Sequence, residues 1–402
     1  MARTQSKLPT KAPAAPSATR ANKKTLAFPS VTTRLPSGRP SADYDKLGIA
    51  FPDPSGDGTM DLAQFFGAPA IAEIEKTGRI QFHAVGDTGV GTASQEAVAD
   101  AMAGDINNTD HAQGPSFMVH LGDVMYGPNK ASHYLDRFYR VYDHYDRLVF
   151  AVPGNHDGEV FPTTDPVTLA AFKENFCEPV GSQPPLAKSY GMLVPNQPGP
   201  YWHLQAPFVD IIGLYSNADE NAGIIKNLVV GGTQKAWLEA RLTAIAAARK
   251  GAVRKALLFA VHHPPYARGF QETVYGHPGN PEMLQDIDDC CAAAGILPDA
   301  VIAGHTHSYQ HYVRTQTLKG TTCTIPYLIV GTGGISLQKV PGPSGVRNAA
   351  GDVLYFSGYQ DYGYLTVTAS ATQLVLLFTA VASGNTQVRE QVTVDLATHA
   401  IL

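Results

Sequence analysis

The sequence predicts an α/β fold in which buried strands alternate with helices. Short apolar runs without polar alternation indicate strands that are buried on both faces, and segments with helical periodicity separate these runs. The composition is typical of a globular chain, because 44% of the 402 residues are hydrophobic and 16% are charged. A chain of this length can bury a full core without disulfides.

The first 45 residues are predicted to form a flexible basic tail, because they are rich in Pro, Ser, Ala and Thr. Residues 1–40 contain no acidic residue, and their basic residues are Arg3, Lys7, Lys11, Arg20, Lys23, Lys24, Arg34 and Arg39. Residues 46–77 are expected to form an N-terminal extension. Residues 78–402 are expected to form the main domain.

Charge and hydropathy exclude some classes of protein. The net charge of −5 argues against a protein that coats nucleic acid. The sequence contains no run of about 18 apolar residues, the length that would indicate a membrane span. The N-terminus also lacks the apolar stretch of a secretory signal. We therefore expect a cytoplasmic protein, with export as the alternative. The four cysteines form neither a disulfide framework nor a CxxC zinc motif.

The main domain begins with alternating strands and helices. Its predicted buried strands are Ile80–Val85, Phe117–Leu121, Leu148–Val152, Ala256–Val261 and Ala300–Ala303. Its predicted helices are Thr92–Ala103, Thr233–Lys250, which Thr233 can cap and Gly251 can end, and Pro281–Ala294. The strands Tyr364–Ala369, Gln373–Ala380 and Gln391–Asp395 follow without helices, so we expect an antiparallel closing sheet there.

Each of the five buried strands leads into polar residues at its carboxyl end. In order, these residues are Asp87; Asp123; Asn155, His156 and Asp157; His262 and His263; and His305 and His307. The carboxyl ends of strands in such sheets converge on one crevice. Gathering so many polar groups without partners would cost several kcal/mol, so packing alone does not explain the pattern.

Metal ions would satisfy these polar groups. Asp, Asn and His offer oxygen and imidazole nitrogen, which suit Fe, Zn or Mn, and no cysteine lies at these strand ends. The ligands outnumber those that one tetrahedral ion needs, and two ions with a bridging carboxylate would use them all. Paired ions are a standard device for hydrolysing phosphate esters.

The strand ends also resemble a known family. They read Gly86-Asp87-Thr88-Gly89, Gly122-Asp123-Val124-Met125-Tyr126, Gly154-Asn155-His156-Asp157, Val261-His262-His263-Pro264 and Gly304-His305-Thr306-His307. This series resembles the five ordered blocks of the calcineurin-like metallophosphoesterases, and it matches the purple acid phosphatase branch best. The resemblance implies a sandwich of two mixed β-sheets flanked by helices, with a dinuclear metal site at the strand carboxyl ends. Residues 78–402 would be the catalytic domain.

Two positions indicate the purple acid phosphatase branch. Many relatives have a metal-binding His two residues after the first Asp, where this chain has Gly89. Tyr126 lies three residues after Asp123, where purple acid phosphatases place a tyrosinate. A phenol has a pKa of about 10, so it needs a strong Lewis acid to lose its proton. Tyr126 therefore implies Fe(III).

The resemblance implies a ligand set for each metal. Asp87, Asp123, Tyr126 and His307 would hold Fe(III) in the first site. Asn155, His262 and His305 would complete the second site around divalent Fe, Zn or Mn, with Asp123 as the bridge. His262 is chosen over His263 because the family's ligand precedes Pro by one intervening residue, although the two could be exchanged.

The resemblance also implies roles towards the substrate. His156 would donate a hydrogen bond to the phosphate or protonate the leaving alkoxide, and Asp157 would orient His156. His263 and His277 would face the substrate. The segment Gly331-Thr332-Gly333-Gly334 follows a predicted strand and resembles the family's glycine-rich loop beside the site.

We therefore expect an acid phosphatase that hydrolyses a small phosphomonoester by attack of metal-bound hydroxide. The alternatives are a phosphodiesterase or nucleotidase on the same scaffold and, from another class, a non-catalytic metal-binding docking module. The natural ester, the identity of the second metal and the oligomeric state do not follow from the sequence.

Overall fold

The computed structural model describes residues 53–106, 110–127, 132–159, 168–177, 187, 192, 194–217, 223, 225–226, 233–251, 253–267, 279, 281–340 and 344–402. The chain divides into two units, residues 1–34 and 35–402. All described residues belong to the second unit, so the predicted tail, residues 1–45, lies outside them.

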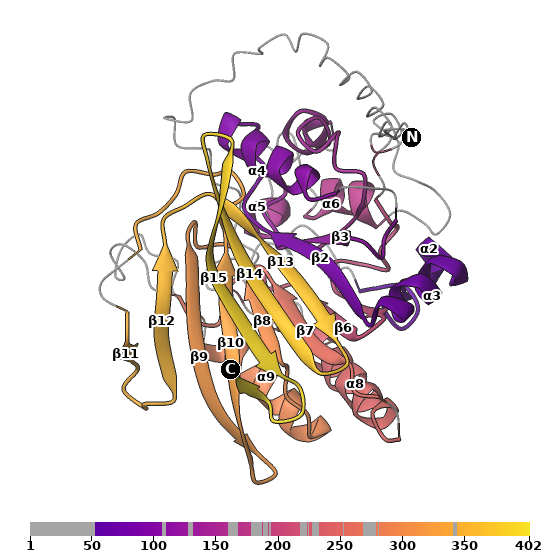
Figure 1. The fold of residues 1–402 in the computed structure, drawn as a ribbon, viewed down its shortest axis with the longest axis vertical. Helices are drawn as coiled ribbons and strands as arrows, with labels where there is room; N and C mark the ends of the chain where they lie inside the picture. The colour runs from indigo at the N-terminus through magenta and orange to yellow at the C-terminus, as the bar shows by residue number, and fades with distance from the viewer. Residues whose placement is uncertain are drawn as a thin grey trace, which may run out of the picture. The chain divides into compact units, whose positions relative to one another are not determined.

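The described strands form two sheets (Figure 1). One has nine strands, in the spatial order β1 (Thr59–Asp61), β5 (Trp202–Ala206), β6 (Val209–Leu214), β7 (Ala256–Val261), β8 (Ala300–Ala303), β10 (Thr321–Val330), β9 (Tyr309–Leu318), β12 (Val353–Tyr359) and β11 (Val346–Arg347). The other has seven, in the order β16 (Ala400–Ile401), β15 (Asn385–Asp395), β14 (Gln373–Ala382), β13 (Gly363–Ser370), β2 (Arg79–Val85), β3 (Pro115–His120) and β4 (Leu148–Ala151).

Both sheets are mixed. Strands β6, β7 and β8 are parallel in one sheet, and β2, β3 and β4 are parallel in the other. The pairs β9–β10 and β13–β14 are antiparallel. The predicted fold class, a sandwich of two mixed sheets flanked by helices, is therefore confirmed.

The main core lies between the two sheets, because the inner faces of both contribute buried side chains to one cluster. Phe82 and Phe117 stack at 4.7 Å within the seven-stranded sheet. Tyr309 of β9 stacks on Phe378 of β14 at 4.1 Å and so joins the two sheets. In Figure 1, β13–β15 lie in front of β8–β10.

Helices cover the outer faces of the sheets. Leu238 of α8 (Thr233–Ala248) and Met283 of α9 (Pro281–Ala294) pack in one cluster with Leu257 of the nine-stranded sheet. Val98 of α4 (Ala93–Gly104) packs in another cluster with Val149 of the seven-stranded sheet. No helix in the described part of the chain is both long and apolar enough to cross a membrane.

The predicted elements of the main domain are present with small differences at their ends. The five strands appear as β2, β3, β4, β7 and β8, and the three helices as α4, α8 and α9. Thr92 caps α4, because its side chain accepts a hydrogen bond from the backbone N–H of Gln95. The predicted strand Gln391–Asp395 extends back to Asn385, which faces Ala382 across a tight turn.

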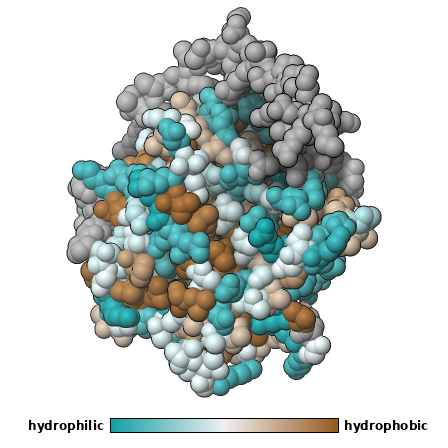
Figure 2. Space-filling model, viewed as in Figure 1, coloured by the Kyte–Doolittle hydropathy of each residue, from teal (hydrophilic) through white to brown (hydrophobic). Residues whose placement is uncertain are grey.

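The C-terminal strands run antiparallel to one another, but they do not form a separate sheet. β13 pairs antiparallel with β2, so these strands continue the sheet of β2, β3 and β4. Figure 2 shows hydrophilic residues interspersed with separate hydrophobic groups on the face seen in Figure 1. This mixture is usual for an antiparallel sheet with one face towards water.

Residues 53–77 pack against the main domain. β1 pairs in parallel with β5 at one edge of the nine-stranded sheet. The helices α2 (Ala63–Phe66) and α3 (Ala68–Thr77) lead directly into β2, and Ile74 of α3 is fully buried in the core between the sheets.

Candidate dinuclear metal centre

The predicted site residues come together where the two sheets meet. Asp87, Asp123 and Asn155 follow β2, β3 and β4 of one sheet, whereas His262 and His305 follow β7 and β8 of the other. Within each sheet, a backbone hydrogen bond joins neighbouring loops, from Asp87 N to the Gly122 carbonyl and from Gly304 N to the His262 carbonyl, both at 3.0 Å. Between the sheets, His305 N donates to Asp87 Oδ2 at 2.8 Å. The carboxyl ends of five strands thus converge even though the strands belong to two sheets.

Three of these residues have strained backbones. Asp87, Asp123 and His305 have φ values of 60°, 52° and 68°, in the left-handed region that side chains other than glycine rarely adopt. Such strain costs of order 1–3 kcal/mol per residue and is concentrated at functional sites. The Asp87 Oδ2 atom compensates partly by accepting the His305 N–H at 2.8 Å.

Glycines allow the loops to approach closely. A Cβ at Gly154 would lie 2.1 Å from Asp123 Oδ1, and a Cβ at Gly304 would lie 2.6 Å from Asp87 Oδ2. A Cβ at Gly89, where many relatives have histidine, would lie 2.2 Å from the Val124 carbonyl oxygen. Position 89 therefore has no room for a ligand side chain in this arrangement.

One group of candidate metal ligands consists of Asp87, Tyr126 and His307. The Tyr126 hydroxyl donates to Asp87 Oδ1 at 3.0 Å and lies 3.4 Å from His307 Nε2. His307 Nε2 lies 3.5 Å from the same Asp87 oxygen. Burial, followed by the charges of Asp123 and Asp87, raises the pKa of Tyr126 well above its ordinary value. The Tyr126 phenol therefore keeps its proton unless a strongly Lewis-acidic cation binds the phenol oxygen and displaces that proton.

A second group surrounds His262. Its Nδ1 lies 2.8 Å from the Leu121 carbonyl oxygen, which only accepts hydrogen bonds, so Nδ1 carries a proton. Its Nε2 faces Asn155 Oδ1 at 3.1 Å and Asp123 Oδ1 at 3.4 Å. An imidazole lone pair aimed at two oxygens needs a proton or a metal ion between them. This arrangement is the one that a metal-ligating histidine requires.

Each group contains one buried carboxylate, Asp87 in the first and Asp123 in the second. Burial and the charge of Asp123 raise the pKa of Asp87 to about 7, although the imidazole of His262 acts in the opposite direction. Burial also disfavours the charge on Asp123, but the nearby imidazole of His262 lowers its pKa. Two buried carboxylates this close disfavour each other's charge, so a cation between them would stabilise both.

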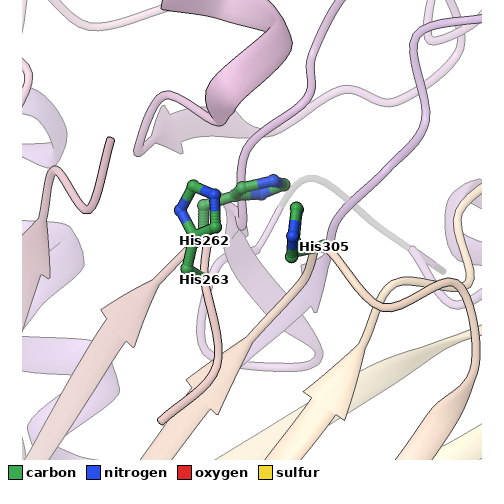
Figure 3. A group of neighbouring side chains, drawn as sticks. All are labelled: His262, His263 and His305. Atoms are coloured by element: carbon green, nitrogen blue, oxygen red, sulfur yellow. The ribbon is translucent and has the colours of Figure 1, made fainter. Parts of the chain in front are cut away.

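The donor set fits metal ions. Two groups of ligand atoms lie within 4.8 Å of one another among the described residues: Asp87, Asp123 and His262, and His262, His263 and His305 (Figure 3). The groups have His262 in common, so they form one continuous cluster. Its oxygen and imidazole donors are those that iron, zinc and manganese accept.

His156 lies beside this cluster. Its backbone N–H donates to Asp123 Oδ1 at 3.0 Å, and its ring packs on the Tyr126 ring at 4.5 Å. Its Nδ1 lies 3.2 Å from Glu159 Oε1. Burial alone would lower the pKa of His156, but the charges of Asp123 and Glu159 raise it to about 9.

The role predicted for Asp157, to orient His156, stays a prediction. The structure pairs His156 with the carboxylate of Glu159 and gives Asp157 hydrogen bonds of its own. Asp157 accepts hydrogen bonds from the backbone N–H groups of Gly154 at 2.8 Å and Val124 at 3.1 Å. It also accepts from Met125 N at 3.2 Å and the Tyr134 hydroxyl at 3.1 Å. Asp157 therefore fastens together the loops that carry the predicted ligands Asp123 and Asn155.

The other predicted site residues are His263, His277 and the glycine-rich loop at residues 331–334. His263 is buried, with its Nδ1 2.9 Å from the Ser216 hydroxyl and its ring 4.2 Å from the His305 ring. His277 lies outside the described residues. The glycine-rich loop supports Asp87, because Gly333 N donates to the Gly86 carbonyl at 3.0 Å and Ile335 N donates to the Asp87 carbonyl at 3.1 Å.

Two partners were missed by sequence reasoning. Glu159 lies three residues after His156, a spacing that places side chains side by side on a helical turn, and this spacing was the available signal. Ser216 follows β6, where nothing in its local sequence marks it, so only the pairing of β6 with β7 brings it to His263.

Comparison with known proteins identifies the class. The family model for calcineurin-like phosphoesterases matches residues 80–309, which is more than half of the chain. The chain therefore belongs to the calcineurin-like phosphoesterases. No curated protein matches the sequence.

Two similar solved structures show the same fold. One is purple acid phosphatase PPD1 from seeds of yellow lupin (Lupinus luteus), with 15% identity and a TM-score of 0.55 over 79% of this chain. That match covers 54% of the lupin chain. The other is GAP50, the anchor in the inner membrane complex of Plasmodium, with 16% identity and a TM-score of 0.53 over 78% of this chain and 90% of that one.

Proposed function

We propose that the protein is a dinuclear-metal phosphatase of the purple acid type that hydrolyses phosphomonoesters. The observation that carries this proposal is the position of Tyr126, whose hydroxyl lies 3.0 Å from Asp87 and 3.4 Å from His307. Membership of the calcineurin-like phosphoesterases supports the wider class, hydrolysis of a phosphoester.

The ligand sets are those predicted from the sequence. Asp87, Asp123, Tyr126 and His307 would hold Fe(III). Asn155, His262 and His305 would hold a divalent Fe, Zn or Mn ion. Asp123 is the proposed bridge, because its carboxylate lies 3.4 Å from His262 Nε2 and its charge acts on both Asp87 and Tyr126.

Bound cations would neutralise charge on a phosphate ester and acidify water. The chain's own contribution is to position the substrate. His156, held between the Tyr126 ring and Glu159, would donate a hydrogen bond to the phosphate or protonate the leaving alkoxide. His277 remains predicted to face the substrate, and so does His263 if it does not bind the second metal ion.

The test combines metal analysis with two substrates. The purified protein should contain iron, show a visible tyrosinate-to-iron absorption band, and hydrolyse p-nitrophenyl phosphate faster than bis-p-nitrophenyl phosphate. A faster reaction with the diester would favour a phosphodiesterase. A colourless protein without iron would overturn the purple assignment.

The similarity to GAP50, described as an anchor, favours one alternative from another class, a metal-binding docking module. Under that alternative the protein would bind two metal ions and hydrolyse neither ester. Asn155→Ala would then lower the metal content without any activity to lose.

A further inference from the structure

The end of β7 supplies two imidazoles where the resemblance implied one metal ligand. His262 and His263 are both buried, at 0% and 2% exposure. Their ligand atoms and that of His305 lie within 4.8 Å of one another. Figure 3 shows the three rings gathered at the ends of β7 and β8.

The orientation of the His263 ring is fixed from the neighbouring strand. Ser216 lies two residues after the end of β6. Its hydroxyl accepts a hydrogen bond from the His263 backbone N–H at 2.9 Å. The same hydroxyl lies 2.9 Å from His263 Nδ1. The Ser216 hydroxyl beside Nδ1 therefore fixes which way the His263 ring faces. This pattern, in which one ring nitrogen is held so that the other can bind, is typical of metal-ligating histidines.

Packing holds the ring in the same direction. The His263 ring centroid lies 4.2 Å from that of His305 and 5.0 Å from that of His262. Gly223 lies against the base of the side chain, because a Cβ on Gly223 would come 2.2 Å from His263 Cβ. The side chain is therefore fixed among the other histidines.

We infer that His263 is a third imidazole ligand of the second metal ion and that this site is selective for Zn²⁺ over Mn²⁺. The inference rests on the proposed dinuclear centre and adds a ligand to it. Zn²⁺ is commonly held by three histidines in catalytic sites, whereas Mn²⁺ prefers oxygen donors. Three imidazoles around one position therefore favour zinc, with Asn155 and Asp123 as oxygen donors beside it.

Metal titration tests the inference without relying on activity. The protein is stripped with a chelator, and the affinities of both sites for Zn²⁺ and Mn²⁺ are measured by competition with an indicator. Zinc-edge X-ray absorption then counts the imidazoles. His263→Ala should weaken zinc at the second site by more than ~100-fold, because loss of an outer partner alone costs about 10–100-fold. One imidazole should disappear from the absorption fit.

Three further variants make the result specific. Ser216→Ala should weaken zinc by about 10–100-fold, as loss of an orienting partner does. His263→Asn keeps a polar side chain at the buried position and should show the same weakening if His263→Ala proves unstable. His144→Ala is the matched control, because His144 is a partly exposed histidine that pairs with Asp100 and Asp143. It should bind zinc normally.

The outcomes separate the inference from the proposed function. If the unmodified protein binds fewer than two metal ions, the dinuclear centre itself fails. If it binds two ions but both His263 variants keep its zinc affinity and imidazole count, only the inference is overturned. A raised KM for p-nitrophenyl phosphate in those variants would then assign His263 to the substrate.

Discussion

The Tyr126 hydroxyl donates a hydrogen bond to Asp87 Oδ1 at 3.0 Å, across 39 residues of sequence. The two side chains are fully or almost fully buried, and both belong to loops that follow strands of the seven-stranded sheet. A neutral phenol beside a carboxylate is stable without a metal, whereas a phenolate in the same place requires a cation. In the proposed centre, the ionisation of the Tyr126 hydroxyl therefore depends on which metal ion occupies the first site.

Tyr126→Phe should remove the visible absorption band of the iron-loaded protein, since only a tyrosinate ligand produces it. Loss of this ligand should also weaken iron by at least about 10-fold, because even outer partners contribute that much. Iron content and the absorption spectrum are the measurements. Tyr142→Phe, which changes another buried tyrosine, is the control. A band that survives in Tyr126→Phe would show that another residue binds the iron.

Glu159→Ala should lower kcat for p-nitrophenyl phosphate by about 10–100-fold, the usual cost of losing a group that orients an active residue. The reason is that Glu159 Oε1 lies 3.2 Å from His156 Nδ1 and fixes the ring. Metal content should remain unchanged, which separates a positioning role from a structural one. Glu174→Ala, on the exposed side of α6 (Ala170–Phe176), should retain full activity. Equal metal loss and activity loss in Glu159→Ala would contradict the role.

Gly154→Ala should weaken metal binding even though it adds only a methyl group. The new Cβ would lie 2.1 Å from Asp123 Oδ1, so the carboxylate or the loop has to move. Elemental analysis after dialysis against a weak chelator measures the effect, which should approach that of Asn155→Ala. Gly104→Ala is the matched control, because no atom lies within 4 Å of its added Cβ. Normal metal content in Gly154→Ala would show that the loop accommodates the methyl group.

Glu390 should contribute stability that depends on pH. It lies on β15 and contacts His311 of β9 at 3.0 Å, so it links the two sheets. Burial alone would raise the pKa of Glu390, but hydrogen bonds from His311 and Ser357 lower it below its ordinary value of 4.5. Its stabilising effect is therefore complete above pH 4.5 and is lost as the pH falls through the lowered pKa.

Thermal unfolding of Glu390→Gln checks this expectation. The variant should unfold at a lower temperature than the unmodified protein near pH ~7, and the difference should shrink towards pH ~3. Glu75→Gln, on the exposed side of α3, should show no such pH-dependent difference. A difference that stays constant over this range would show that the charge of Glu390 is not the cause.

Much of the fold followed from local patterns. Apolar runs such as Ala256–Val261 and capped segments such as Pro281–Ala294 have their predicted bounds, because periodicity and helix-ending residues act over a few neighbours. The pairing of β13 with β2 did not follow from such patterns, since nothing in either strand specifies its partner. The family resemblance implied two mixed sheets, but only the structure shows which of the five strand ends belongs to which sheet.

Some residues of the candidate site could be predicted from the sequence, and others could not. The residues at the strand ends could be found because each directly follows a recognisable strand. The spacing of Glu159 from His156 was a local signal that went unused, whereas Ser216 could not be assigned because its role depends on which strands pair in space. The role predicted for Asp157 came from its neighbour in sequence, whereas its hydrogen bonds to the loop after β3 could not be predicted from the sequence.

The pairing of β13 with β2 has a consequence for biosynthesis. The ribosome makes β2, which leads into Asp87, almost three hundred residues before Gly363–Ser370 emerges to cover that strand's free edge. Until then the edge is open to pairing with other chains. We therefore expect that shortening the chain before residue 363 would leave an aggregation-prone intermediate, even though all the proposed metal ligands precede that residue.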